Sequence, residues 1–188
     1  LAANVRVCGY AAEHERHLQR IACTLTGLSQ RLRMPVLIVP IAHNTDDSDV
    51  SSGRRLAQLF TNGVPRIIDD PTLGPAIIKG ILGASYAAVG VSYHLCTFAL
   101  SQGVPAVCIF DGAYYGHKAR GIAKFWNEPR LAQDLSASNA DALGEVIAGV
   151  LTDNALRATL HGRAQDARRH WAAEFTRATS LLAGPTHE

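Results

Sequence analysis

Apolar residues along the chain switch repeatedly between helix-like and strand-like spacing. Between about residues 11 and 33 they recur near every 3.6 positions, which predicts a helix. Four short apolar runs without inner alternation follow, and each predicts a buried strand. The inward positions of the helix are Leu18, Ile21, Ala22, Leu25, Leu28 and Leu32, and the four runs are MPVLIVPIA (34–42), VPRIID (64–69), YAAVGVS (86–92) and PAVCIF (105–110).

Helices are expected between these runs. One begins near Asp49 or Ser51, another at Pro75 and a third at Tyr93. A helix running into Trp126, a looser stretch, and helices from about residue 141 to the C-terminus complete the pattern. Buried strands separated by helices predict an α/β fold, a Rossmann-like parallel sheet with helices on both faces. Residues 1–188 are expected to form a single domain.

Composition and motifs narrow the function. The formal net charge is only +2, which gives no reason to expect nucleic acid as a partner. The patterns GxGxxG, GxSxG and HExxH and the P-loop are absent, which weakens assignments to dinucleotide oxidoreductases, serine hydrolases, metalloproteases and nucleotide kinases. The cysteines lack CxxC spacing, so we expect small core residues in a reducing, cytoplasmic compartment; they are Cys8, Cys23, Cys96 and Cys108.

In parallel sheets, ligands bind where the carboxyl ends of strands lead into helices. The VGVSYH seam places Ser92 as a helix N-cap and His94 in the first turn, while Gly103 fits the end of that helix. Unpaired N–H groups at such a start attract anions, and a histidine there can bind phosphate or transfer a proton. The alternative is that Ser92 only caps the helix and His94 only bonds to backbone.

Two further seams carry candidate binding groups. In DGAYYGHKAR, Tyr114 and Tyr115 can pack on a sugar or an enol, and Lys118 and Arg120 can hold phosphate. The alternative is a solvated helix start with Tyr114 covering the core. In HNTDDSD, His43 and three carboxylates could meet acceptor hydroxyls or a divalent ion, or could form only a solvated loop. We assign no metal site and no cofactor.

The string SYHLCTFALSQGVPAVCIFDGAYYGHKARGIAKFW (92–126) resembles the polysaccharide pyruvyl transferase family. Members show S/R-x-H, then a FALSxGxP passage, then YY and a lysine before a GL-like turn. VPIAHNTDDSD upstream is similar to the family's strand and acidic loop, so that the resemblance runs from about Arg31 to Trp126. The matching positions are Ser92, Tyr93, His94, Phe98 to Ser101, Gly103, Pro105, Tyr114, Tyr115, Lys118 and Gly121.

This resemblance implies a GT-B-like architecture of two Rossmann-like halves, in which the chain is the C-terminal, donor-binding half and an N-terminal domain is missing. It implies phosphoenolpyruvate as donor and, as acceptor, a sugar of a surface polysaccharide (exopolysaccharide) or its lipid-linked precursor. The product would be a pyruvate ketal, with phosphate released. A lipid-linked acceptor would bring the protein to the inner membrane face. Alone, the chain is expected to bind weakly or turn over poorly.

The resemblance also implies residue roles. His94 is carried over as the catalytic acid or base, and the helix start at Tyr93 and His94 as the phosphate site. Many members have arginine where this chain has Ser92, so Lys118 or Arg120 would supply the missing charge. Two other hypotheses stay open: a GT-B glycosyltransferase domain that uses a nucleotide sugar, and a non-catalytic carbohydrate-binding domain.

Overall fold

A six-stranded parallel sheet forms the centre of the molecule, in the order β3-β2-β1-β4-β5-β6. The structure is a computed structural model that describes residues 1–6, 11–43 and 49–183, with side chains for all of these except 11–14, 182 and 183. The Rossmann-like α/β class predicted from the sequence is confirmed. The strands are β1 (Ala2–Asn4), β2 (Leu37–Ile38), β3 (Arg66–Ile67), β4 (Ala88–Gly90), β5 (Ala106–Phe110) and β6 (Ala132–Asp134).

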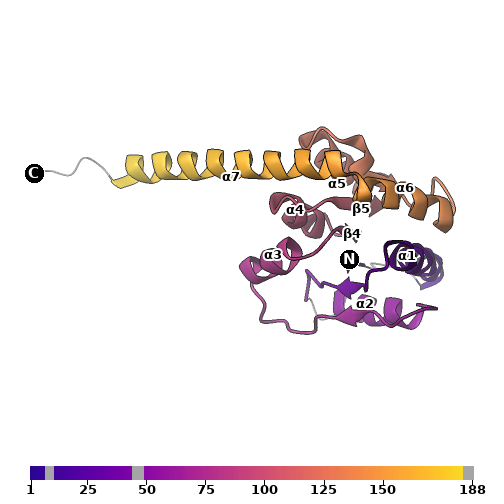
Figure 1. The fold of residues 1–188 in the computed structure, drawn as a ribbon. Helices are drawn as coiled ribbons and strands as arrows, with labels where there is room; N and C mark the ends of the chain where they lie inside the picture. The colour runs from indigo at the N-terminus through magenta and orange to yellow at the C-terminus, as the bar shows by residue number, and fades with distance from the viewer. Residues whose placement is uncertain (7–10, 44–48, 184–188) are drawn as a thin grey trace, which may run out of the picture.

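Helices cover both faces of this sheet. On one face α1 packs against α2 and α6, and on the other α4 packs between α3 and α5 (Figure 1). The helices are α1 (Ala11–Leu32), α2 (Asp49–Gln58), α3 (Pro75–Gly83), α4 (Tyr93–Ser101), α5 (Gly112–Phe125), α6 (Ala140–Thr152) and α7 (Asn154–Ala183), with a short 3-10 turn, η1 (Pro129–Leu131), before β6.

The four apolar runs predicted as strands contain β2, β3, β4 and β5, each shorter than its run. Strands β1 and β6 were not predicted from the sequence. Strand β1 is only three residues long, yet it pairs with β2 on one side and β4 on the other and is completely buried. The inward face predicted for the first helix is confirmed, because Leu18, Leu25 and Leu28 are buried in α1.

The strand order reverses direction at β1. The chain proceeds from β1 outward to β2 and β3, then returns to place β4 on the other side of β1. In open parallel sheets such a switch point leaves a crevice beyond the carboxyl ends of the two strands, where ligands bind. Here the crevice lies between the residues that follow Asn4 and those that follow Gly90.

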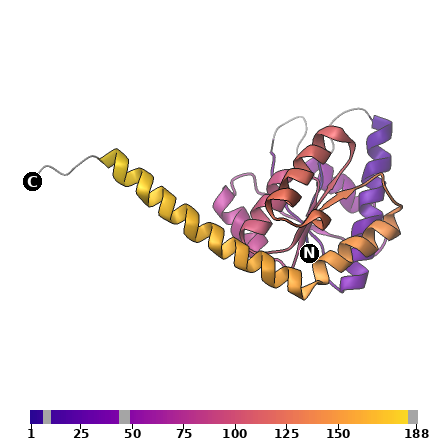
Figure 2. The same ribbon diagram turned by 90° about the horizontal axis from the view of Figure 1, so that it is seen from above.

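The last helix, α7, extends well past the body of the molecule (Figures 1 and 2). Its first half packs on α4 and α6. Trp171, which lies beyond this first half, is 65% exposed. No helix in the described part of the chain is both long enough and apolar enough to cross a bilayer.

Gly90 allows β4 to approach β1 closely at the switch point. A Cβ atom on Gly90 would meet Leu95 Cδ2 at 2.7 Å and both Cβ and the carbonyl oxygen of Asn4 at 3.1 Å. Because two of these neighbours belong to a buried strand, they cannot yield easily. We expect Gly90→Ala to lower the free energy of unfolding by about 1–3 kcal/mol, measured by urea denaturation.

Gly80 in α3 provides the matched control, since a Cβ there would meet nothing within 4 Å. Gly80→Ala should leave stability unchanged or raise it by about 0.5–1 kcal/mol, because alanine favours a helix interior. Equal effects of the two substitutions would contradict the close approach of β4 to β1.

Candidate functional site

A small cavity lies at the switch point, at the start of α4. Its volume is about 110 Å³, and it joins residues from the ends of β1 and β4 to residues of α5. Four other residues predicted for the site therefore lie around the same cavity as His94: Ser92, Tyr93, Tyr115 and Lys118. The lining residues are Arg6, Val91, Ser92, Tyr93, His94, Cys108, Tyr115 and Lys118.

A second, larger cavity of about 410 Å³ lies on the other side of His94. It shares Arg6, Ser92 and His94 with the first cavity, so these three residues stand between the two. Its other walls are mostly apolar and come from the segment after β2, from α3 and the loop before it, and from α4: Ile41, Ala42, Leu73, Pro75, Ile78 and Phe98.

The start of α4 presents free backbone donors to this site. Ser92 is the N-cap residue as predicted, but its hydroxyl makes no capping hydrogen bond. The first turn of a helix has N–H groups without partners inside the helix, and the helix dipole makes that end positive. At its other end α4 stops at Ser101, and Gly103, the predicted stop, follows the C-cap Gln102 with φ of 77°. The start of α4 is therefore suited to an anion.

His94 is exposed at this helix start and is held by aromatic neighbours. Its ring centroid lies 5.6 Å from that of Tyr93 in an edge-on arrangement and 6.1 Å from that of Phe98. Among the residues that the structure describes, none forms a hydrogen bond with the imidazole. The bonding of His94 to backbone alone, considered as an alternative, is thus not seen, and both ring nitrogens are available to a ligand.

Arg6 is a candidate site residue that was not predicted from the sequence. It follows β1, and 34% of its side chain is exposed where it lines both cavities beside Ser92 and His94. Its guanidinium places a positive charge beside Ser92, from the segment that follows β1. An arginine just after the carboxyl end of a strand is a sequence feature that could have identified it. That strand, β1, has only three residues and was too short to be recognised.

Lys118 and the tyrosines lie across the small cavity on α5. Lys118 and Tyr115 line it, and the Lys118 Nζ is 4.3 Å from the ring centroid of Tyr114. Tyr114 is 65% exposed, so it does not cover the core as the alternative supposed. Its ring meets that of Tyr115 edge-on at 5.2 Å. Tyr114 therefore touches the site through Lys118 and Tyr115.

The remaining two candidates lie elsewhere. Arg120 stacks over Phe110, with 5.2 Å between the guanidinium carbon and the ring centroid, and lines a different cavity together with Asp134. His43 is exposed at the start of the acidic loop, and it contributes to lowering the pKa of Asp70, which hydrogen bonds from Thr72 lower more strongly. Residues 44–48 of that loop are outside the described residues.

No cluster of three metal-ligating side chains occurs in the part of the chain the structure describes.

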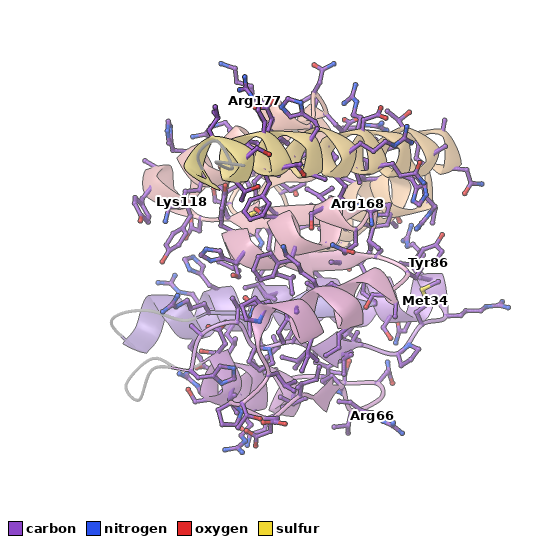
Figure 3. The ribbon with its side chains drawn as sticks, turned by 90° about the vertical axis from the view of Figure 1, so that its left-hand side faces the viewer. Met34, Arg66, Tyr86, Lys118, Arg168 and Arg177 are labelled. Atoms are coloured by element: carbon purple, nitrogen blue, oxygen red, sulfur yellow. The ribbon has the colours of Figure 1, made fainter. Side chains whose placement is uncertain are left out.

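A groove of about 730 Å³ adjoins the site between α4, α5 and α7. It shares Tyr93 and Lys118 with the small cavity, so the two spaces are neighbours. Both tryptophans of the chain line it, and Figure 3 shows Lys118 and Arg168 beneath α7. Its lining contains basic but no acidic side chains: Lys79, Tyr93, Thr97, Ser101, Gln102, His117, Lys118, Gly121, Ile122, Phe125, Trp126, Ala164, Ala167, Arg168 and Trp171.

Comparison with known families identifies the chain. A family model described as polysaccharide pyruvyl transferase matches residues 5–109, more than half of the sequence. The chain belongs to the polysaccharide pyruvyl transferase family. The matched region contains Arg6, Ser92 and His94 but ends before Tyr114, Tyr115 and Lys118. Membership in the polysaccharide pyruvyl transferase family therefore bears on the first three residues more directly than on the last three.

Solved structures similar to the chain are glycosyltransferases of the GT-B fold, with identities that show the fold alone. They include a mutant O-GlcNAc transferase of Thermobaculum terrenum (TM-score 0.60, 11% identity), the glycosyltransferase of kitacinnamycin (0.56, 14%) and the calicheamicin glycosyltransferase CalG4 (0.54, 16%). These matches cover 90%, 94% and 98% of this chain but only 32%, 42% and 43% of the other chains. No protein of curated function matches the sequence.

The cysteines divide into buried and exposed thiols. Cys96 and Cys108 are buried as predicted, and Cys108 forms part of the wall of the small cavity. Cys23 is exposed, contrary to the prediction, and Cys8 lies outside the described residues. A hydrogen bond with Cys108, together with complete burial, raises the pKa of the Cys96 thiol.

A raised thiol pKa means less thiolate, the reactive form, at any pH below that pKa. We therefore expect iodoacetamide at pH 8 to modify Cys23 of the folded protein while Cys96 stays unmodified, as peptide mass mapping would show. In denaturant both should react alike. Modification of Cys96 at the rate of Cys23 in the folded protein would contradict the buried thiol pair.

Proposed function

We propose that the chain is the donor-binding half of a polysaccharide pyruvyl transferase, and that it binds phosphoenolpyruvate at the start of α4. The observation that carries this proposal is the meeting of Arg6, His94 and the α4 N-terminus at one switch-point cavity. A guanidinium, a helix N-terminus and an imidazole together match a small phosphorylated anion. Family membership supports the same donor.

Each group then has a role in holding the donor. The N–H groups of the first turn of α4 and the Arg6 guanidinium would bind the phosphate oxygens, because both offer several donors with positive charge. Lys118, across the small cavity, would add a second cation for the phosphate or the carboxylate. Because Ser92 stands where many family members have an arginine, the positive charge at the phosphate would come from Arg6, after β1, and from Lys118 on α5.

His94 would act as the acid and base of the transfer. A proton added to the methylene carbon of phosphoenolpyruvate makes it a methyl group and leaves an oxocarbenium-like centre at the neighbouring carbon. One sugar hydroxyl attacks that centre and gives its proton back to His94. The bond from this carbon to the phosphate oxygen then breaks, a second hydroxyl of the sugar attacks the same carbon and closes the ketal, and its proton leaves with the phosphate. Positive charge around the phosphate stabilises it as it departs.

The groove beneath α7 would lie on the acceptor side. It shares Tyr93 and Lys118 with the donor cavity, so a group bound there would be close to His94. Aromatic faces such as those of Tyr93 and Trp171 suit the apolar faces of sugar rings. The basic lining also suits an acceptor that carries phosphate, including a lipid-linked one. A second, N-terminal domain would close the cleft over both spaces.

A GT-B glycosyltransferase acting on a nucleotide sugar is the second candidate. Two of the similar structures were solved with UDP-2fluoro-glucose or UDP, and the shared fold favours this reading. Affinity for the donor separates the two candidates directly. A preference for a UDP-sugar over phosphoenolpyruvate would support the glycosyltransferase.

We expect isothermal titration of the chain to show saturable binding of phosphoenolpyruvate that exceeds the binding of UDP-glucose. Arg6→Gln should weaken this binding about 10- to 100-fold, because it removes charged hydrogen bonds to phosphate worth about 1.5–3 kcal/mol. His94→Gln should weaken it about tenfold for the same reason.

Two substitutions away from the site are matched controls. Arg55→Gln removes a guanidinium paired with Glu15 on the surface, and His170→Gln removes an exposed imidazole of α7. Both should bind phosphoenolpyruvate as the unaltered chain does. Binding that resists Arg6→Gln and His94→Gln would move the donor away from α4, and no binding of phosphoenolpyruvate at all would refute the donor-site proposal.

A further inference from the structure

Asp49 is a buried carboxylate behind the candidate site. It is the first residue of α2 and is 1% exposed. Its Oδ2 accepts three hydrogen bonds, from Asn4 Nδ2 at 2.9 Å, from the Ile41 amide at 2.9 Å and from the Ala42 amide at 3.1 Å. One oxygen of Asp49 thus ties the end of β1 to the segment after β2.

The other oxygen faces Arg6. Asp49 Oδ1 and Arg6 Nε are both enclosed and have no hydrogen-bond partner among the described residues, and they lie 3.9 Å apart. A buried carboxylate oxygen without compensation is costly, and an opposite charge at this distance supplies that compensation. Among the described residues, Asp49 is the acidic side chain that pairs with Arg6.

The shape of the guanidinium determines which of its nitrogens face Asp49 and which face the cavities. Nε lies on one side of the planar fork, and the two terminal nitrogens lie beyond it. Arg6 has its Nε enclosed on the Asp49 side, yet a third of its side chain is exposed and lines both cavities. The two terminal nitrogens are not among the enclosed, unpartnered atoms of the described residues, which fits a guanidinium whose Nε faces the carboxylate and whose terminal end faces the cavities.

We propose that Asp49 is a positioning residue that orients the Arg6 guanidinium toward the anion bound at the start of α4. The identity of that anion as phosphoenolpyruvate rests on the proposed function, but the orientation of Arg6 does not. Asp49 does not touch the ligand. It holds Nε by charge, so that both terminal nitrogens remain free to donate to the ligand.

One test needs no ligand. The Arg6 Nε–H signal can be followed by ¹⁵N NMR in the chain of residues 1–188 and assigned by its loss in Arg6→Lys. We expect slow exchange of this proton with solvent in the unaltered chain and at least tenfold faster exchange in Asp49→Asn. Exchange that is the same in both proteins would overturn the positioning role.

A second test separates positioning from mere structural support. The affinity for phosphoenolpyruvate is measured for Asp49→Asn, Arg6→Lys and the double variant. Lysine has no Nε–H fork to orient, so positioning predicts about a tenfold loss from Asp49→Asn in the unaltered chain but less than twofold in the Arg6→Lys background. A structural role predicts equal losses in both backgrounds, and that result would refute the inference.

Asp69→Asn is the matched control. Asp69 follows β3 at the same edge of the sheet, but it is half exposed and pairs with Arg54. It should change neither Arg6 exchange nor phosphoenolpyruvate affinity. Urea denaturation checks that Asp49→Asn stays folded. If it does not, Arg6→Lys and Arg6→Gln decide. Lysine keeps the charge without the fork, so an Arg6→Lys variant that binds phosphoenolpyruvate as weakly as Arg6→Gln would support positioning, and one that binds as tightly as the unaltered chain would oppose it. Absence of phosphoenolpyruvate binding by the unaltered chain would overturn the proposed function and leave the exchange test to judge Asp49.

Discussion

Strand β1 is the constraint on which the site depends. It has three residues, all buried, and it joins the two halves of the sheet by pairing with β2 on one side and β4 on the other. Its last residue, Asn4, touches Gly90 closely and binds Asp49, so the end of β1 fixes the positions of both α2 and the start of α4. The side chains that meet at the switch point come from segments far apart in the sequence.

The sequence was most informative where a pattern is local. The 3.6-residue spacing of α1, the apolar runs of β2 to β5 and the start and glycine stop of α4 were all predictable, because each depends on neighbours in the chain. Strand β1 was missed because Ala2 and Ala3 carry little strand preference and three residues show no period. Missing β1 meant missing Arg6, since only its pairing with β4 brings that side chain to His94.

The structure also separates residues that sequence proximity had grouped. Lys118 and Arg120 were considered together as phosphate ligands, but side chains two positions apart on a helix point in directions about 160° apart. Accordingly, Lys118 faces His94, while Arg120 turns to Phe110 and Asp134. The helical period alone would have allowed us to predict that Lys118 and Arg120 cannot both face the site. The enclosure of Asp49 could not have been foreseen, because its acidic loop is typical of a solvated segment.

Helix α7 has a mechanical consequence. Its 30 residues span about 45 Å, and only its first half rests on the body of the molecule. The free half, about 22 Å long, is therefore a lever arm: a tilt of about 5° where it leaves the body displaces its tip by about 2 Å. Any structure seated against Trp171 and Phe175 would transmit its movements to the base of α7, where Ala164 and Arg168 border the groove beside the site.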